Sequence, residues 1–194
     1  MTETPGANPQ AETEQDQPVL VAIDFSDDSR AALVWACEYV DCIGARLILL
    51  HVIHDPASSP GFYRSGSPGQ MQPMQDVAES MMSDFMADMT TNHPHLEALK
   101  TADTHLIQGL PPGRIVEVAG LLKAKMIVIG SRGMTGLDHI LLGSVAERVV
   151  ELAHGPVVVV KSEHGGKKTK KEKKRKKDKK RLKDKLLNHE EADG

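Results

Sequence analysis

The sequence predicts an α/β fold: a doubly wound, mostly parallel sheet of five strands with helices on both faces, as a single domain between two tails. Short apolar runs rich in branched residues alternate with segments whose apolar residues recur at helical spacing. The runs are continuous, which is typical of strands buried on both faces, and the helices between them favour parallel crossover connections. The expected strands are 19–23, 46–52, 104–108, 126–129 and 157–160.

Helical segments fill the intervals between these strands. Ser26-Asp-Asp-Ser29 supplies side chains that cap helix starts, just before a helical segment at 31–43. Pro111 and Pro112 open another helix that runs to about Leu122, because proline fits the first turn. Further helices are expected at 76–91, where the methionines fit either core packing or a partner surface, and at 144–152, with a long loop at 54–73.

Charge is distributed unevenly along the chain, whose net charge is −3. Residues 161–194 contain 15 Lys and Arg against 7 Asp and Glu, whereas residues 1–160 contain 9 against 20. The expected organisation is a disordered acidic N-terminal tail (1–17), one domain (18–162) and a Lys-rich basic tail (163–194). The basic tail is either solvated charge or a segment that binds polyanions, namely nucleic acid or an anionic membrane.

The chain has no sequence signal for export or membrane insertion. Its first residues lack the basic and apolar regions of a signal peptide, and no apolar run approaches the roughly 20 residues of a membrane helix. Cys37 and Cys42 lie on different faces of an expected helix, so we predict reduced thiols rather than a disulfide. These features favour a cytoplasmic protein.

Four loops are expected at the carboxyl edge of the sheet, where Rossmann-like folds bind ligands. The fourth loop runs from Gly130 to a helix start at Gly143-Ser144. Gly130 and Gly133 allow sharp turns and a close approach of the backbone to a ligand. Unpaired amides and the dipole at the helix start favour a phosphate, but the dipole supplies only about 0.3–2 kcal/mol, so several donors must converge.

The fourth loop resembles the ATP-binding signature of the universal stress proteins. The match consists of Gly130-x2-Gly133-x9-Gly143-Ser144, with similar text around it at 127–136 and 142–149 and at the opening, 21–26. The resemblance covers about 19–161 and excludes both tails. It implies an ATP-binding domain, with Mg²⁺ arriving with the nucleotide, and a homodimer that pairs through Val157–Val160.

The resemblance also implies roles for individual residues. Asp24 would contact the nucleoside, although it can also act as a loop acid or a helix cap. Arg132 can reach a phosphate, stay solvated or form an ion pair. The adenine pocket is expected from Ala22, Ile23 and Val52, the ribose and phosphate surroundings from Ile129 and Gly130, and the triphosphate cradle from Gly133, Gly143, Ser144 and Val145. Thr135, Asp138 and His139 are expected at a surface or interface.

Catalytic and metal-binding patterns are weak in this sequence. No nucleophile–base pair or carboxylate cluster lies near the fourth loop, the Walker A lysine is absent, and no cluster completes a zinc site with the histidines. We predict an ATP-binding stress-response or regulatory protein in which nucleotide occupancy of a homodimeric domain modulates partner interactions. The alternatives are a slow ATP-hydrolysing enzyme and a scaffold that binds polyanions through its basic tail.

Overall fold

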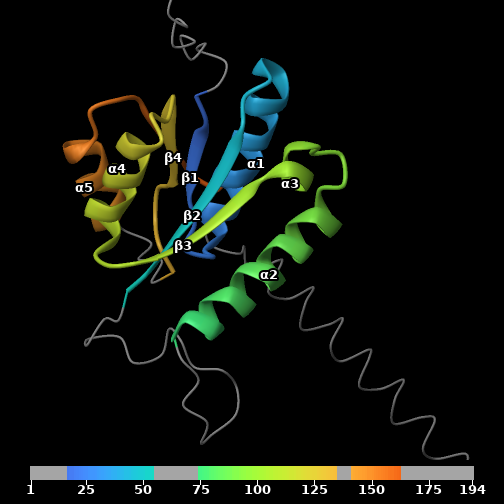
Figure 1. Cartoon of the computed structure of the whole chain (residues 1–194), viewed down its shortest axis with the longest axis horizontal. Coiled ribbons are helices and arrows are strands. Elements are labelled where there is room, and N and C mark those ends of the chain that lie inside the picture. The colour runs from blue at the N-terminus through green and yellow to red at the C-terminus, as the bar shows by residue number, and fades with distance from the viewer. Residues whose placement is uncertain (1–16, 55–73, 135–140, 163–194) are drawn as a thin grey trace, which may run out of the picture. The chain divides into compact units, whose positions relative to one another are not determined.

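Five parallel strands form the sheet at the centre of the domain. The computed structural model describes residues 17–54, 74–134 and 141–162. The strand order is β3-β2-β1-β4-β5 and every neighbouring pair is parallel (Figure 1). The predicted fold class is therefore confirmed. The strands are β1 (Val19–Ala22), β2 (Leu47–Ile53), β3 (Asp103–Gln108), β4 (Met126–Gly130) and β5 (Val157–Val160).

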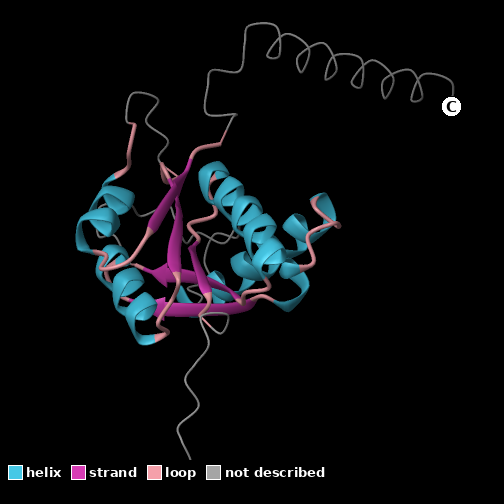
Figure 2. Ribbon diagram, turned by 90° about the horizontal axis from the view of Figure 1, so that it is seen from above, coloured by secondary structure: helices cyan, strands magenta, loops and turns pink. Residues whose placement is uncertain are grey.

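Helices cover both faces of this sheet, as the two ribbon views show (Figures 1 and 2). One face carries α1 (Asp27–Ile43), α2 (Met74–Asn92) and α3 (Ala98–Thr101). The other carries α4 (Pro111–Leu121) and α5 (Ser144–Leu152). The short helix α3 was not predicted, because four residues are too few to show a helical period.

The side chains of β1 alternate between two buried layers. Val19 and Val21 join the layer under α1, α2 and α3, whereas Leu20 and Ala22 join the layer under α4 and α5. Both layers exclude water, so the strand reads as a continuous apolar run. In α2, Met82 and Met89 are buried in the first layer and Met81 and Met86 are half-buried, which confirms core packing for this methionine-rich helix.

The two edge strands differ from the central three. Most of β3 is exposed, and the valines of β5 are half-buried or exposed, because each edge strand has one neighbour. Every residue of β1 and β2 is buried. The continuous apolar pattern therefore indicates burial on both faces for the central strands, while the four valines of β5 occupy an edge.

The strand order places a crevice between β1 and β4. The chain adds β2 and β3 on one side of β1 and then returns to add β4 and β5 on the other side. The connections leave the carboxyl ends of β1 and β4 in opposite directions, which is where doubly wound sheets bind ligands. The starts of α1 and α5 flank this point, since each helix follows one of these two strands in the chain.

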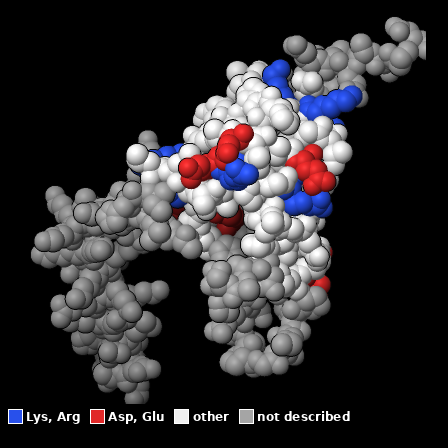
Figure 3. Space-filling view, turned by 90° about the vertical axis from the view of Figure 1, so that its left-hand side faces the viewer, with Lys and Arg blue, Asp and Glu red and all other residues white. Residues whose placement is uncertain are grey.

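Exposed ion pairs mark the face that α4 and α5 cover. Arg114 contacts Glu117 at 2.6 Å, and Arg148 contacts Glu151 at 2.5 Å. Basic and acidic side chains accordingly alternate on the side of the molecule drawn in Figure 3. Pairs of this kind contribute about 0–1 kcal/mol each, and they place both signs of charge on this face.

Several predictions fall outside the described residues. They are the N-terminal tail, the long loop beyond His54, the basic tail, and Thr135, Asp138 and His139. Of the helices in the described part of the chain, none is both long enough and apolar enough to span a lipid bilayer.

Candidate functional site

A cavity of about 420 Å³ lies at the carboxyl ends of β1, β2 and β4 and at the starts of α4 and α5. Its size is within the range of small-molecule sites. All of the residues predicted for the nucleotide site line it, namely Ala22, Ile23, Asp24, Val52, Ile129, Gly130, Arg132, Gly133, Gly143, Ser144 and Val145. The structure thus brings them together, and their contact with a ligand remains a prediction.

Eight further residues line the cavity, and none of them was predicted from the sequence to belong to the site. They are Leu50, His51, His54, Pro111, Ile115, Ser131, Met134 and Ala146. Some had a readable signal: Leu50 is two residues from Val52 on the same strand, and Pro111 and Ile115 are one helical turn apart. Ser131 and Met134 lie inside the glycine-rich loop itself.

The end of the cavity next to β1 and β2 is mainly apolar and holds one buried imidazole. Nδ1 of His51 lies 2.8 Å from the carbonyl oxygen of Ile23. Burial lowers the pKa of His51, although the Ile23 hydrogen bond and the charge of Asp24 oppose this. The ring is therefore neutral near pH 7, and Nδ1–H donates to Ile23. The ring of Phe25, a residue with φ of 67°, lies 4.5 Å from His51.

Asp24 is a loop acid beside the start of α1 that also lines the cavity, and its contact with a nucleoside stays a prediction. Its Oδ1 accepts hydrogen bonds from the Ser26 amide at 3.1 Å and from the Ser26 hydroxyl at 2.5 Å, so it organises the start of α1. Its Oδ2 lies toward Gly133, where an added Cβ would approach it to 2.9 Å. A side chain at position 133 would therefore make the Asp24 carboxylate shift.

The other end of the cavity is the start of α5. Gly143 is the N-cap residue and offers no side-chain cap, and Ser144 and Val145 are exposed. The amide of Glu147 donates to the Gly143 carbonyl at 2.9 Å, so the three amides before it have no acceptor within the helix. These amides and the helix dipole favour an anion at this end.

The Gly143 amide has a hydrogen-bond partner within the protein. We expected it among the phosphate donors, but it donates to the carbonyl oxygen of Ser131 at 2.7 Å. An added Cβ on Gly143 would lie 3.4 Å from that same oxygen. Gly143 therefore fastens α5 to the loop after β4, and the open donors of the helix begin at Ser144.

The physical reason for a glycine at position 130 differs from the one expected. A Cβ on Gly130 would lie 2.8 Å from the backbone carbon of Asp28 and 2.8 Å from the amide nitrogen of Ser29. Real Cβ atoms do not come this close to a backbone. Gly130 lines the cavity, but what requires a glycine there is the close packing of β4 against the first turn of α1.

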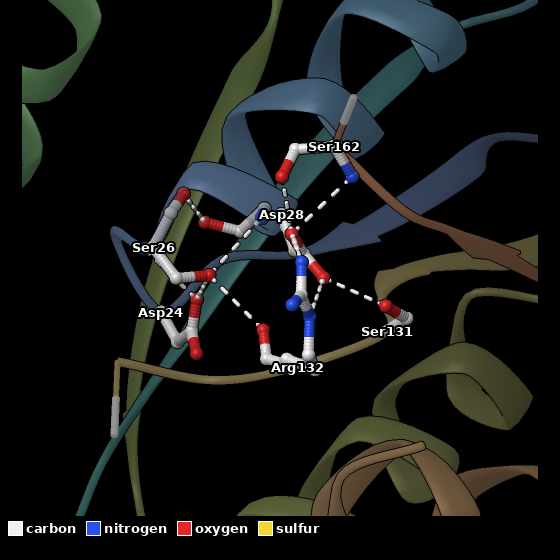
Figure 4. A network of polar contacts seen from close by, with 7 residues as sticks. Asp24, Ser26, Asp28, Ser131, Arg132 and Ser162 are labelled. Carbon is white, nitrogen blue, oxygen red and sulfur yellow. Dashed lines mark hydrogen bonds and ion pairs between the residues drawn. The ribbon is translucent and has the colours of Figure 1, made fainter. Parts of the chain in front are cut away.

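The buried carboxylate of Asp28 binds the loop that follows β4, although Asp28 itself does not line the cavity (Figure 4). Its Oδ2 accepts from the Ser131 hydroxyl at 2.7 Å and from Nε of Arg132 at 3.0 Å. Its Oδ1 accepts from Nη2 of Arg132 at 3.0 Å and from the hydroxyl and amide of Ser162 at 2.5 and 3.2 Å. We call these four residues the Asp28 network. Among the alternatives for Arg132, the structure shows the ion pair.

Charge and hydrogen bonds decide the ionisation of Asp28. Burial by itself raises the pKa of the carboxyl, but hydrogen bonds from Arg132, Ser131 and Ser162 outweigh it and hold the pKa well below its usual range. A bidentate guanidinium and three further donors satisfy the carboxylate, as a buried charge requires. Asp28 is therefore ionised at any physiological pH.

The chemistry of the cavity is that of a binding site. It offers an apolar end, one acidic side chain and a helix start with open donors. Among the residues that the structure places, no group of three or more His, Cys, Asp or Glu side chains is arranged to hold a metal ion. A divalent cation at this site would therefore need ligands from a bound molecule as well as from the protein.

Comparison with known proteins assigns this architecture. The model of the universal stress protein family matches residues 17–161. A universal stress protein of Thermus aquaticus is 31% identical over 146 residues, which cover 74% of this chain and 97% of the relative. The solved structure of MJ0577 from Methanocaldococcus jannaschii superposes with a TM-score of 0.53 at 26% identity, over 76% of this chain and 97% of that one.

Two further comparisons concern a relative solved with a ligand and the lengths of the curated relatives. A universal stress protein of Archaeoglobus fulgidus, solved in complex with dAMP, has the same fold, with a TM-score of 0.53 at 24% identity over 75% of this chain and 98% of that one. A Mycobacterium tuberculosis relative is longer, and this chain spans 46% of its length at 29% identity. The match to a relative from M. jannaschii is local: it is 57% identical over 58 residues, which are 34% of that relative.

Proposed function

The chain belongs to the universal stress protein family, and on that premise we propose that it binds ATP in the cavity at the carboxyl edge and that occupancy of the site, in a homodimer, modulates its contacts with partners. The observation that carries the proposal is the composition of one cavity. An apolar end, the carboxylate of Asp24 and the uncapped start of α5 lie around the same space. The A. fulgidus relative, solved with dAMP, supports an adenine nucleotide as the ligand class.

The polarity of the cavity orients the nucleotide. Ala22, Leu50 and Ile129 are buried apolar residues of adjacent strands and suit the flat adenine ring. Asp24 repels phosphate but accepts hydrogen bonds from hydroxyl groups, so it suits the ribose. The phosphates then extend toward α5, where the amides of Ser144 and Val145 and the Ser144 hydroxyl can donate hydrogen bonds to them.

A magnesium ion fits this arrangement as a companion of the triphosphate. Mg²⁺ in nucleotide sites is bound through phosphates and water with one or two protein oxygens. The Ser144 hydroxyl supplies an oxygen at the cavity wall, at the end toward which the phosphates extend. The ion would offset phosphate charge, while the residues of this chain bind and orient the nucleotide.

We propose that the homodimer forms through β5. In the part of the chain that the structure places, β4 is the single sheet neighbour of β5, so the other edge of the four valines offers free backbone groups. Val159 is also 37% exposed. An apolar sheet edge of this kind is an aggregation hazard unless another chain covers it. Pairing with a second copy removes the hazard.

A reducing compartment suits the two thiols, and we place the protein in the cytoplasm. Cys37 is buried and Cys42 is exposed, and both are free. Burial, reinforced by the charges of Asp41 and Glu38, raises the pKa of Cys37 to about 12, so this thiol is inert near pH 7.

Ser144→Asp tests ATP binding directly. An acidic side chain at the start of α5 is favourable for the helix dipole but repels phosphate, so stability and affinity should change in opposite directions. We expect calorimetric affinity for ATP to fall by at least roughly tenfold, while the melting temperature does not fall. Ser83→Asp adds the same charge on the exposed side of α2 and should leave affinity unchanged. Unchanged affinity in folded Ser144→Asp contradicts the proposal.

Hydrolysis separates the binding role from the enzymatic alternative. The Ser131 hydroxyl lines the cavity, but its proton is engaged in a hydrogen bond to Asp28 at 2.7 Å. We expect bound ATP to remain largely intact through purification, as mass spectrometry of the gently purified protein would show. Rapid steady-state release of phosphate or pyrophosphate would instead favour the enzymatic alternative.

The basic C-terminal segment favours a second role, polyanion binding. Residues 161–194 contain 15 Lys and Arg. Binding through such a segment releases counterions, so the affinity should fall steeply as salt rises and show no preference for sequence. The test compares DNA binding by the full chain and by a shortened chain that ends at Ser162, at low salt. Equal binding by the two chains would rule this role out.

A further inference from the structure

The Asp28 network joins three segments that are far apart in the sequence. Asp28 is in the first turn of α1, Ser131 and Arg132 follow β4, and Ser162 follows β5 (Figure 4). The contacts of Asp28 with Ser131 and Ser162 span 103 and 134 positions of sequence. One carboxylate thus connects the loop of the nucleotide cavity with the end of the edge strand.

Ser131 is the point at which the loop is held. Its amide donates to the Val160 carbonyl of β5 at 2.7 Å, and its carbonyl accepts from the Gly143 amide at 2.7 Å. Its hydroxyl donates to Asp28 at 2.7 Å. Three elements therefore fix the position of one residue, and the Ser131 amide is engaged with β5 instead of facing the cavity.

Arg132 is held on the same side. Its guanidinium makes two hydrogen bonds with Asp28, and its carbonyl oxygen accepts from the Ser26 hydroxyl at 3.3 Å. The side chain is 11% exposed and the Asp28 side chain is 4% exposed. The loop thus has its side chains anchored in a buried polar layer, and this orients its backbone along the cavity wall up to Gly133.

We propose that Asp28 is a positioning residue for the nucleotide site and that Ser162 acts on the site through it. The inference rests on the proposed function, since it concerns how the same cavity is kept in shape. Ser162 is buried and is not among the residues that line the cavity. Any influence of its hydroxyl on nucleotide affinity must therefore pass through Asp28 and the loop, and the geometry of the β5 end becomes coupled to the site.

The coupling gives the site a physical link to the β5 edge. A change that shifts Ser162, such as a chain that pairs with β5, alters one of the two oxygens on which Arg132 depends. Networks of buried polar side chains transmit coupling of modest size between sites. The loop in turn determines where the backbone near Gly133 lies.

Ser162→Ala tests the inference against Ser29→Ala. Ser29 is also buried, in the same helical turn as Asp28, but its hydroxyl donates to the Ser26 carbonyl and not to the network. We expect calorimetric ATP affinity to fall roughly 3- to 10-fold in Ser162→Ala and to change less than about twofold in Ser29→Ala. In an Asp28→Ala background, Ser162→Ala should have no further effect, because the carboxylate that accepts from Ser162 is absent.

Hydrogen exchange of the ligand-free protein provides a readout that does not depend on ATP. We expect faster exchange of the amides at 131–134 in Ser162→Ala, with no such change in Ser29→Ala. Unchanged exchange and unchanged affinity in Ser162→Ala overturn the inference. A third outcome is faster exchange in Ser162→Ala together with a wild-type protein that binds no adenine nucleotide. That result upholds the positioning of the loop and overturns the proposed function instead.

Discussion

Two helices begin beside the cavity, and their first turns are built in opposite ways. At α1, Ser26 caps the helix by accepting from the Ser29 amide at 3.1 Å, and the buried Asp28 takes part in the network with Arg132. At α5, the N-cap is Gly143, which provides no side-chain cap, and Ser144 is exposed. The start of α1 is closed by protein groups, and the start of α5 is open to the cavity.

The difference separates stability from binding. Both helix starts have the same unsatisfied amides and the same positive dipole end. At α1 these are used within the protein, so substitutions there should lower the free energy of unfolding. At α5 the first three amides have no acceptor within the helix, and we propose that they bind phosphate, so substitutions there should change affinity with little effect on stability.

Asp28→Ala should have the largest effect at the closed end. It leaves the buried guanidinium of Arg132 without its carboxylate, and breaking a buried ion pair in this way costs about 3–5 kcal/mol. Urea denaturation at pH 7 measures the loss. Asp27→Ala removes the neighbouring exposed acid and should change the unfolding free energy by less than about 0.5 kcal/mol. Equal losses in the two variants would contradict the assignment of Asp28 as the buried partner.

The contribution of Asp28 should also depend on pH. Its pKa in the folded protein is well below the ordinary value, so the stabilisation is fully present above about pH 4 and is lost as pH falls toward the folded pKa. We therefore expect the difference in stability between wild type and Asp28→Asn to be constant from pH 5 upward and to shrink below about pH 4. A difference that grew on acidification would have the wrong sign.

Gly130→Ala should cause the next largest loss of stability, because the new methyl group pushes β4 away from the first turn of α1. The new methyl group would lie 2.8 Å from two backbone atoms of α1, which cannot move as a flexible side chain can. We expect a loss of about 1–3 kcal/mol in thermal or urea unfolding. Gly120→Ala is the control: this exposed glycine of α4 has open space around it, and alanine should stabilise the helix by up to about 1 kcal/mol.

Ser26→Ala should have a smaller effect at the same end. It removes the N-cap of α1 and the hydroxyl partner of Asp24, at a cost of about 1 kcal/mol in unfolding free energy. Ser83→Ala, in the exposed face of α2, serves as the comparison and should stay within about 0.5 kcal/mol of wild type. A melting temperature of Ser26→Ala equal to that of wild type would mean that the α1 end is not closed by its cap.

Gly143→Ser should have the smallest effect on stability and would make the open end resemble the closed one. The hydroxyl supplies the missing cap, which is worth a few tenths of a kcal/mol relative to glycine. The same hydroxyl competes for an amide that we assign to the phosphates, so calorimetric affinity for ATP should fall. Affinity that is unchanged or higher would show that the ligand does not use the start of α5.

Local patterns were sufficient to predict the sheet and most of the helices. The branched apolar runs at 19–23 and 126–129 indicated buried strands, and the capping segment at 26–29 contains Ser26, which caps α1. The predicted site residues meet in one cavity because carboxyl ends of parallel strands share one edge. The short helix α3 had no such pattern and was missed.

The Asp28 network could not be predicted in the same way. Asp28 was read as one of several capping residues at 26–29, because that is what an acid in this position usually does. Its partners Ser131 and Ser162 lie more than 100 positions away, and no local pattern connects them to it. The reason for glycine at 130 was also hidden, because it depends on the distance between β4 and α1 in the folded domain.

The reversal of strand order has a consequence for chain synthesis and proteolysis. One wall of the cavity includes residues 22–24, 50–52 and 54, and the other includes residues 129–134 and 143–146, so a nascent chain or fragment that ends before residue 129 lacks one wall of the site. A ligand that needs both walls can bind no such fragment and adds its binding free energy to the unfolding of the completed domain. Resistance to protease in the presence of nucleotide would then report that synthesis and folding have both finished.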